Sequence, residues 1–318
     1  MSSATINRSS GNRPSDPAKL RVPAPVQSKT TGLLSCWCGA EQWKVCFKAR
    51  RGGLVRCERC GCYQTDPPPL TDSDRAKEFY TQYYASHEVL ANPAPVTGDS
   101  RTAGFWKVAS QVPVLQKVET RIADIGCGDG HLCRELVYAG WSKVVGVEAS
   151  DVRVERARKF YPQVTFHSSS LGEGGEAPGS FDVIVMEAVI EHLPDPVGLL
   201  RELRRFLRAG GRIVLTTPNL DSGHFRVLGR RWTGMLAPHA HIFMFTESSI
   251  KEVMELAGFE AEAAGSFRDA HYTIKQWTKR LFSGDVKGAI WRAHQEMGTL
   301  YGRMIGKHEM LFGVGRVR

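Results

Sequence analysis

A glycine-rich turn directly follows a short apolar run near the middle of the chain. Ile122–Ile125 leads into Gly126–Gly130, and Leu132, Leu136 and Val137 then recur at the spacing of an amphipathic helix. Glycine lets the backbone turn sharply and approach a ligand closely, and the first turn of a helix offers unpaired N–H groups. The stretch therefore predicts a strand, a ligand-binding loop and a helix in direct succession.

Short apolar runs alternate with amphipathic stretches from residue 119 onward. The runs that we expect to form strands are Arg121–Ile125, Lys143–Val147, Val164–His167, Phe181–Met186 and Gly211–Thr216. Strands that alternate with helices favour a mostly parallel sheet covered on both faces. Residues 119–318 are therefore predicted to form one doubly wound α/β domain.

The residues around the glycine loop restrict the ligand that it binds. His131 stands where a dinucleotide-binding fingerprint needs its third glycine, and the loop lacks the Gly-Lys-Ser/Thr ending of a P-loop. Glu148 ends the next predicted strand, twenty residues after Gly128. A carboxylate in that position can accept hydrogen bonds from both hydroxyls of a ribose. We therefore expect a ligand that carries a ribose.

These features together resemble the class I S-adenosylmethionine-dependent methyltransferases, in particular types 11, 12 and 23. Asp-x-Gly-x-Gly-x-Gly at 124–130 matches their first motif, and Glu148 matches their ribose-binding acid. Phe181–Glu187, Glu191–Pro196 and Leu207–Arg212 resemble their fourth strand, the segment after it and the turn before the fifth strand. The resemblance implies a Rossmann-like, mostly parallel seven-stranded sheet with an antiparallel last strand. It also implies S-adenosyl-L-methionine as the cofactor, lying across the carboxyl ends of strands one to four.

The resemblance assigns cofactor-binding residues to the loop and to the strand ends around it. They are Asp124, Gly126, Cys127, Gly128, Gly130, Glu148, Ala149, Ser170, Leu171 and Glu187. One position departs from the family's pattern, because Ser168-Ser169-Ser170 stands where an acid usually lies near the adenine amino group. A serine hydroxyl hydrogen-bonds there more weakly than a carboxylate would.

Two histidines are candidates for the chemical step. Methyl transfer is an in-line displacement, so the enzyme aligns the acceptor and removes its proton, and imidazole titrates near neutral pH. His192 follows the fourth predicted strand, and His241 precedes Phe245-Thr246 in a segment that resembles methyltransferases of bacterial glycan and natural-product pathways. We expect one histidine to act as the base and the other to position the acceptor. The alternative is that Glu191 and His192 cap or orient the next helix and that His241 holds a loop over the fifth strand.

The sequence before His192 also bears on metal binding. Some quinone-pathway relatives carry Glu-x-x-Glu-His at this place and resemble metal-assisted enzymes. The first of those glutamates falls on Ala188 in this chain, with Glu187 one place earlier. A shift by one residue turns a side chain by about 100° on a helix, so no metal is predicted beside His192.

Six of the eight cysteines fall between residues 36 and 62. They include two close pairs, Cys36 with Cys38 and Cys57 with Cys60. This spacing can place four thiolates around a structural zinc ion, so residues 31–70 are predicted to form a zinc-ribbon-like module. Ser35 stands where a first cysteine is usual, which leaves Cys46 and Cys62 as alternatives for the fourth ligand. The other alternative is a metal-free cluster of reduced thiols.

Composition assigns the remaining segments. Residues 1–30 are rich in Ser, Pro and basic residues and lack large apolar ones, so we expect a disordered tail. Residues 71–118 are predicted to form a helical linker or cap, with an aromatic helix over residues 74–87. A helical insertion is predicted at about 267–307, where apolar residues recur at helical spacing from Val286 to Met304. It could select the acceptor as a lid, contact an anionic membrane surface, or cover a face of the sheet.

The net charge of +9 is concentrated at the two ends of the chain. Residues 1–30 carry five basic residues and one acid, residues 266–318 carry ten and four, and the middle has 27 against 28. A protein dedicated to binding nucleic acid would carry an excess of basic residues in its central domain as well. A small-molecule acceptor is therefore favoured. The alternatives are an RNA methyltransferase and a non-catalytic zinc-ribbon scaffold. Because no apolar run approaches the roughly eighteen residues of a membrane helix, and no leader-like stretch is visible, we expect a cytoplasmic protein.

Overall fold

The structure is a computed structural model that describes residues 33–48, 53–68, 103–110, 112–229, 232, 240–268 and 286–318. The predicted tail at 1–30 and the predicted aromatic helix at 74–87 lie outside these residues. Within 71–118, the described residues form the helix α2 (Ala103–Ala109) and the 3-10 helix η1 (Pro113–Gln116).

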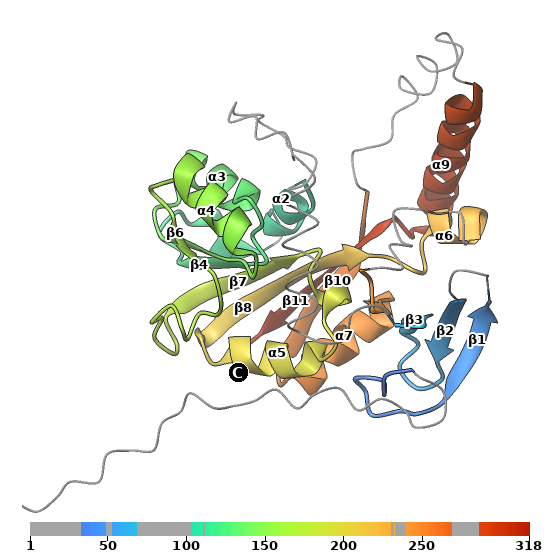
Figure 1. The fold of residues 1–318 in the computed structure, drawn as a ribbon, viewed down its shortest axis with the longest axis horizontal. Helices are drawn as coiled ribbons and strands as arrows, with labels where there is room; N and C mark the ends of the chain where they lie inside the picture. Colours follow the sequence, from blue (N-terminus) through green and yellow to red (C-terminus); the bar gives the residue numbers. More distant parts are fainter. Residues whose placement is uncertain are drawn as a thin grey trace, which may run out of the picture.

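In the described part of the chain, seven strands form the main sheet in the spatial order β10-β11-β8-β7-β4-β5-β6 (Figure 1). The strands are β4 (Ile122–Ile125), β5 (Val144–Val147), β6 (Thr165–His167), β7 (Phe181–Glu187), β8 (Leu207–Pro218), β10 (Glu260–Phe267) and β11 (Met310–Arg316). β11 runs antiparallel to β8 and β10, whereas the pairs from β6 to β8 are parallel. This confirms the predicted Rossmann-like sheet with an antiparallel last strand. Because β4 lies between β5 and β7, the strand order reverses there, and ligands bind beyond the carboxyl ends of strands at such a point.

Helices cover both faces of this sheet (Figure 1). α2, α3 (His131–Tyr138) and α4 (Asp151–Phe160) lie on one face, and α5 (Pro196–Arg204) and α7 (Glu247–Leu256) lie on the other. All residues of β4 and β5 are buried, as expected for strands between two helical layers. Leu132 and Leu136 of α3 are buried in the layer beneath it, so the predicted helix after the glycine loop is confirmed.

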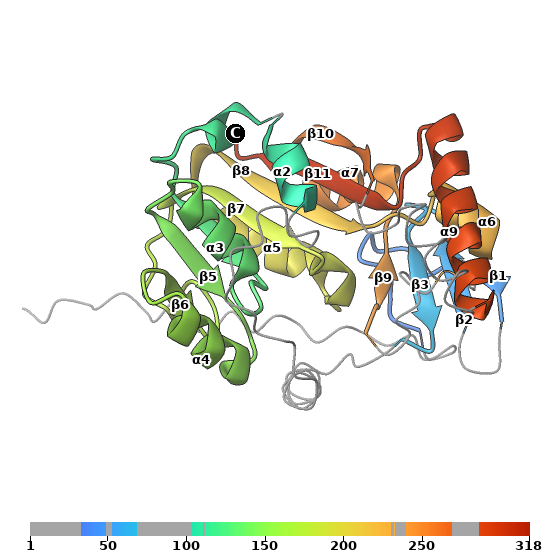
Figure 2. The same cartoon turned by 90° about the horizontal axis from the view of Figure 1, so that it is seen from above.

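A second, four-stranded sheet is built from two distant parts of the chain (Figure 2). Its strands are β1 (Trp43–Phe47), β2 (Gly53–Cys57), β3 (Tyr63–Asp66) and β9 (Phe243–Met244), in that spatial order. β9 pairs antiparallel with β3, with Tyr63 opposite Met244 and Gln64 opposite Phe243. The cysteine-rich module, which we call the ribbon, therefore takes its fourth strand from the main domain.

The helix α9 (Val286–Ile305) packs against α6 (Gly223–Leu228) and stands apart from the main sheet (Figures 1 and 2). Gly298 makes this close contact, because a Cβ there would lie 2.9 Å from His224. Among the side chains of this helix that the structure describes, six large apolar ones are exposed: Val286, Ile290, Met297, Leu300, Tyr301 and Met304. The interpretation that the insertion covers a face of the sheet is therefore wrong for α9. In the described ranges, no helix is long and apolar enough to cross a bilayer.

Candidate active site

The loop after β4 has the conformation that its glycines predict. Gly126, Gly128 and Gly130 have φ values of 75°, 57° and 79°, in the left-handed region that other residues avoid. A Cβ on Gly126 would overlap the Val189 side chain, and one on Gly128 would overlap the guanidinium of Arg153. The loop therefore needs glycine both for its backbone angles and for its close neighbours.

Glu148 lies directly against this loop. Its carboxylate accepts hydrogen bonds from the amides of Gly128 at 2.9 Å and of Ser150 at 3.0 Å. Glu148 is only 8% exposed, and the residue after it, Ala149, is exposed. Two residues that are twenty positions apart thus meet at the loop. Two backbone amides hold the carboxylate in place, and its remaining lone pairs can accept ribose hydroxyls.

Arg153 is a neighbour of this site that the sequence analysis missed. Its guanidinium lies 3.5 Å from Glu148 and 3.7 Å from Asp129, and Arg156 also contacts Asp129, at 3.2 Å. The available signal was its place at the start of α4, the helix that follows Glu148. The positive charge of Arg153 offsets the two carboxylates that the fold brings together beside the loop.

Asp124 lies beneath the loop, not on its surface. Its side chain is 2% exposed, and the Cys133 thiol donates to it at 3.6 Å. Burial raises the pKa of Asp124 from 3.8 to about 7, because the ionised form is poorly solvated there. Asp124 therefore supports the loop from below.

The other predicted cofactor residues surround the same strand ends. Cys127 and Leu171 are buried, at 8% and 2% exposure. The Ser170 hydroxyl accepts from the amide of Glu173 at 3.2 Å, which engages it in a local turn. The Glu187 carboxylate accepts from the amide of Phe105 in α2, at 3.4 Å.

His192 and His241 lie together beyond the carboxyl end of β7. Their ring centroids are 4.9 Å apart, and the Nδ1 of His192 lies 2.8 Å from the carbonyl oxygen of Ala240. This contact identifies Nδ1 as the protonated nitrogen, which leaves the Nε2 of the neutral ring with a lone pair. The buried Glu191 carboxylate accepts from the Thr217 hydroxyl at 2.9 Å.

The structure shows whether Glu191 and His192 cap the next helix, α5, or face His241. The helix α5 is capped by Asp195, whose side chain accepts from the amide of Gly198. Glu191 and His192 face His241 instead, with their ligand atoms within 4.8 Å of one another. Two imidazoles and a carboxylate at this separation can take a proton from an acceptor, and they can also bind a divalent transition metal ion.

Trp232 lies in the segment that leads to His241. It is 3% exposed and packs with Leu54, Leu228 and Met244. Pro238 and His239 lie outside the described residues.

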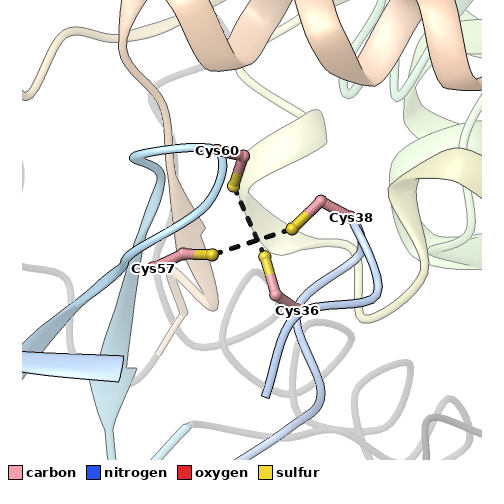
Figure 3. A group of neighbouring side chains, drawn as sticks. All are labelled: Cys36, Cys38, Cys57 and Cys60. Carbon is pink, nitrogen blue, oxygen red and sulfur yellow. Dashed lines mark hydrogen bonds between the residues drawn. The ribbon is translucent and has the colours of Figure 1, made fainter. Parts of the chain in front are cut away.

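The buried cysteines of the ribbon converge on one point (Figure 3). The Sγ atoms of Cys38 and Cys57 are 3.7 Å apart, and the Sγ of Cys36 lies 3.5 Å from Cys60 and 3.4 Å from Cys62. Cys62 is thus a fifth thiol beside the predicted four. Cys46 lies on β1 with an exposed side chain and outside this group.

The thiols of this cluster differ in acidity: burial raises the pKa of Cys38 and Cys62, and a hydrogen bond with Cys60 raises the pKa of Cys36, whereas two thiols are held as thiolates. The contact with Cys62 lowers the pKa of Cys57 to about 6, and the contacts with Cys36 and Cys62 lower the pKa of Cys60 to about 2. Buried thiolates at these separations are suited to a soft or borderline metal ion such as zinc. The donor set therefore fits the predicted metal.

Comparison with known proteins identifies the family. The chain matches a methyltransferase-domain family over residues 100–264, which is more than half of its length. It belongs to the methyltransferases. A trans-aconitate 2-methyltransferase of an Azoarcus species is 31% identical over 185 residues, which cover 50% of this chain and 72% of the relative. A probable S-adenosylmethionine-dependent methyltransferase of Mycolicibacterium smegmatis is 29% identical over 183 residues, covering 54% and 68%.

Further relatives are consistent with this identification. A ubiquinone biosynthesis O-methyltransferase of Aromatoleum aromaticum is 30% identical over 156 residues, covering 46% of this chain and 66% of the relative. A Pyrococcus horikoshii protein of known structure has the same fold, with a TM-score of 0.50, 15% identity and coverage of 74% and 99%. The methyltransferase therefore has the class I fold, and S-adenosylmethionine-dependent methyl transfer is its class of activity.

The buried carboxyl of Asp124 predicts a pH-dependent loss of stability in this methyltransferase. Between pH 4 and 7 the folded chain retains a proton on Asp124 that the unfolded chain has released, so stability falls as pH rises through this range. The free energy of unfolding of the wild type, relative to Asp124→Asn, should fall by up to about 4 kcal/mol and then stay constant.

Urea denaturation across this pH range measures the difference. The exposed carboxyl of Glu173 provides the control, because Glu173→Gln should leave the pH profile of the wild type unchanged. A constant difference between wild type and Asp124→Asn at all pH values would contradict the expectation.

Proposed function

We propose that this methyltransferase binds S-adenosyl-L-methionine over the glycine loop and methylates a small-molecule acceptor beside the His192–His241 pair. The observation that carries the proposal is the convergence of two constellations at adjacent strand ends. The loop and Glu148 lie at the ends of β4 and β5, and the histidines lie beyond the end of β7, the neighbour of β4. Donor and acceptor sites then meet at the point where the strand order reverses.

A few groups with fixed positions would bind the cofactor. S-adenosylmethionine supplies a methyl group on a sulfonium when it is bound. Gly126 and Gly128 keep side chains out of the way of the ligand, and the Glu148 carboxylate accepts the ribose hydroxyls. Backbone beside the exposed Ala149 and the buried Leu171 would line the adenine, with the Ser170 hydroxyl near its amino group.

The acceptor side requires a group that takes a proton. The Nδ1 of His192 donates to the carbonyl of Ala240, so Nε2 is the proton-accepting atom of the neutral ring. His241 lies against this ring and would orient the acceptor. The two roles can also be exchanged. An oriented base and a fixed acceptor are what an in-line displacement needs from the protein.

The acceptor that we propose is a small molecule with an ionisable group. Relatives named for trans-aconitate and for ubiquinone biosynthesis support a small-molecule acceptor. The resemblance of the segment around His241 to glycan and natural-product methyltransferases supports a sugar or natural-product intermediate. Contact of the exposed face of α9 with an anionic membrane surface stays a prediction.

We further propose that the ribbon holds one structural zinc ion. The ligands would be Cys36, Cys38, Cys57 and Cys60, with Cys62 as the alternative for the fourth. A site closed by four thiolates has no open position for catalysis, so the role of the metal would be structural.

Cofactor binding and turnover should respond to different residues. Glu148→Ala should weaken S-adenosylmethionine binding by about 1.5–3 kcal/mol, because it removes charge-assisted hydrogen bonds. His192→Ala and His241→Ala should each leave the dissociation constant unchanged. The one that acts as the base should lower kcat by roughly 10²–10⁴-fold. Calorimetry gives the affinity, and turnover is measured on the best acceptor from a panel of carboxylic acids, phenols and sugars.

Two matched variants serve as controls for this split. Glu173→Ala removes an exposed carboxyl, and His294→Ala removes an exposed histidine of α9. Both should behave as wild type. An unchanged dissociation constant in Glu148→Ala would remove that residue from the cofactor site. Near-normal turnover in both histidine variants would refute the assignment of a histidine base. Catalysis would then depend only on the alignment of cofactor and acceptor.

The zinc proposal predicts about one zinc ion per chain in freshly purified protein. Elemental analysis should find it in the wild type and in Cys46→Ser, whose exposed thiol lies outside the cluster. The double variant Cys57→Ser/Cys60→Ser should lose it, because two of the four thiolates are removed. Metal-free wild type, or equal zinc in the double variant, would refute the proposal.

A further inference from the structure

The short segment 240–242 connects the ribbon to the histidine pair. We propose that Thr65, in the last strand of the ribbon, is a positioning residue for His241, so that the ribbon sets the geometry of the acceptor site. The inference rests on the proposed function in one respect, namely that His192 and His241 handle the acceptor. The positioning of His241 by Thr65 does not depend on which acceptor is used.

Thr65 holds two consecutive peptide units of this segment. Its hydroxyl donates to the carbonyl of His241 at 2.9 Å, and its amide donates to the carbonyl of Ile242 at 3.2 Å. Thr65 is 3% exposed, so water does not compete for these bonds. Two donors from one buried residue fix both the place and the orientation of the backbone that carries the His241 ring.

The same segment is bound on its other side to the neighbours of His192. The amide of Ile242 donates to the carbonyl of Glu191 at 2.8 Å, and the Ala240 carbonyl lies 2.8 Å from the Nδ1 of His192. Residues 240–242 therefore contact the ribbon and the other histidine at once. A displacement of Thr65 would move both rings, because both depend on this backbone.

The ribbon strand that carries Thr65 is itself fixed from the cysteine side. The buried side-chain amide of Gln64 accepts from the amide of Leu34 at 3.0 Å and donates to its carbonyl at 3.3 Å. Leu34 lies two residues before Cys36, one of the converging cysteines. The ring of Trp37 also stacks on Phe245, with centroids 6.1 Å apart. The cysteine cluster, β3 and the histidine segment thus form one continuous chain of contacts.

A threonine has a specific advantage at this position. Valine has the same shape and would keep the packing and the backbone bond to Ile242, but it has no hydroxyl for the His241 carbonyl. Serine keeps the hydroxyl and loses only a methyl group. The pair Thr65→Val and Thr65→Ser therefore separates the hydrogen bond from the packing.

The control is the same substitution at a second buried threonine. The Thr120 hydroxyl also donates to a backbone carbonyl, that of Val114 at 2.6 Å, and the side chain is 4% exposed. Val114 belongs to η1, and neither residue is part of the histidine site. Thr120→Val thus reports the effect of losing an equivalent bond elsewhere in the fold.

The experiment follows the imidazole nitrogens of His192 and His241 by NMR in the full-length chain, with assignments from His192→Ala and His241→Ala. We expect Thr65→Val to displace both sets of signals and to weaken the Nδ1-protonated signature of His192. The Ile242 amide should exchange with solvent about fivefold faster, because the lost Thr65 hydroxyl bond, worth about 1 kcal/mol, would no longer stabilise the segment against opening. Thr65→Ser should restore both, and S-adenosylmethionine affinity should be unchanged throughout. If Thr65→Val does not fold, Thr65→Ala is measured in its place.

The outcomes separate this proposal from the proposed function. Wild-type imidazole signals and Ile242 exchange in Thr65→Val would overturn the positioning role, as would an equal displacement in Thr120→Val. If the signals move but His192→Ala and His241→Ala retain turnover, the positioning stands and the catalytic assignment of the histidines fails. If turnover depends on the histidines while the signals do not move, the catalytic assignment of the histidines stands and the positioning role of Thr65 fails.

Discussion

The antiparallel pairing of β3 with β9 is the interaction on which the arrangement of this methyltransferase depends. Without β9, the outer edge of β3 would present unpaired N–H and C=O groups, which is a liability in any sheet. The main domain covers that edge with Phe243 and Met244 of β9 and with the carbonyl of Ile242, which accepts from the Thr65 amide. The next residue, Phe245, bridges to Asn219 just after β8, so the same short stretch joins both sheets.

The candidate site has two parts, a cofactor part and a histidine part, and different elements hold each of them in place. The cofactor part is held by the main sheet, through the glycine loop after β4 and the Glu148 carboxylate after β5. The histidine part is held by β7 and β8 on one side and by the ribbon on the other, since Glu191 bonds to Thr217 and Thr65 bonds to His241. Under the proposed function, the ribbon would act on the histidine part through Thr65.

The sequence predicted the parts of this fold that have a periodic or chemical signal. The parallel strands and the glycine loop follow from apolar runs and glycine spacing, and the place of Glu148 at a strand end follows from its position after the second apolar run. β9 was not predicted, because two residues show no periodicity and their partner lies almost 180 positions away. The role of α9 was left open between three alternatives, since periodicity shows that a helix has two faces but not which one packs. The face that packs on α6 carries Gly298 and the buried Thr299, whose hydroxyl lies 3.3 Å from the Nε2 of His224.

The central claim is that the ribbon and the histidine segment form one cooperative unit, separate from the cofactor loop. Hydrogen exchange by mass spectrometry, in full-length protein with and without a zinc chelator, tests it in one experiment. We expect chelation to open the peptides over residues 53–66 and 240–246 together, while residues 122–130 retain their protection. Opening of 53–66 with full protection of 240–246 would contradict the account.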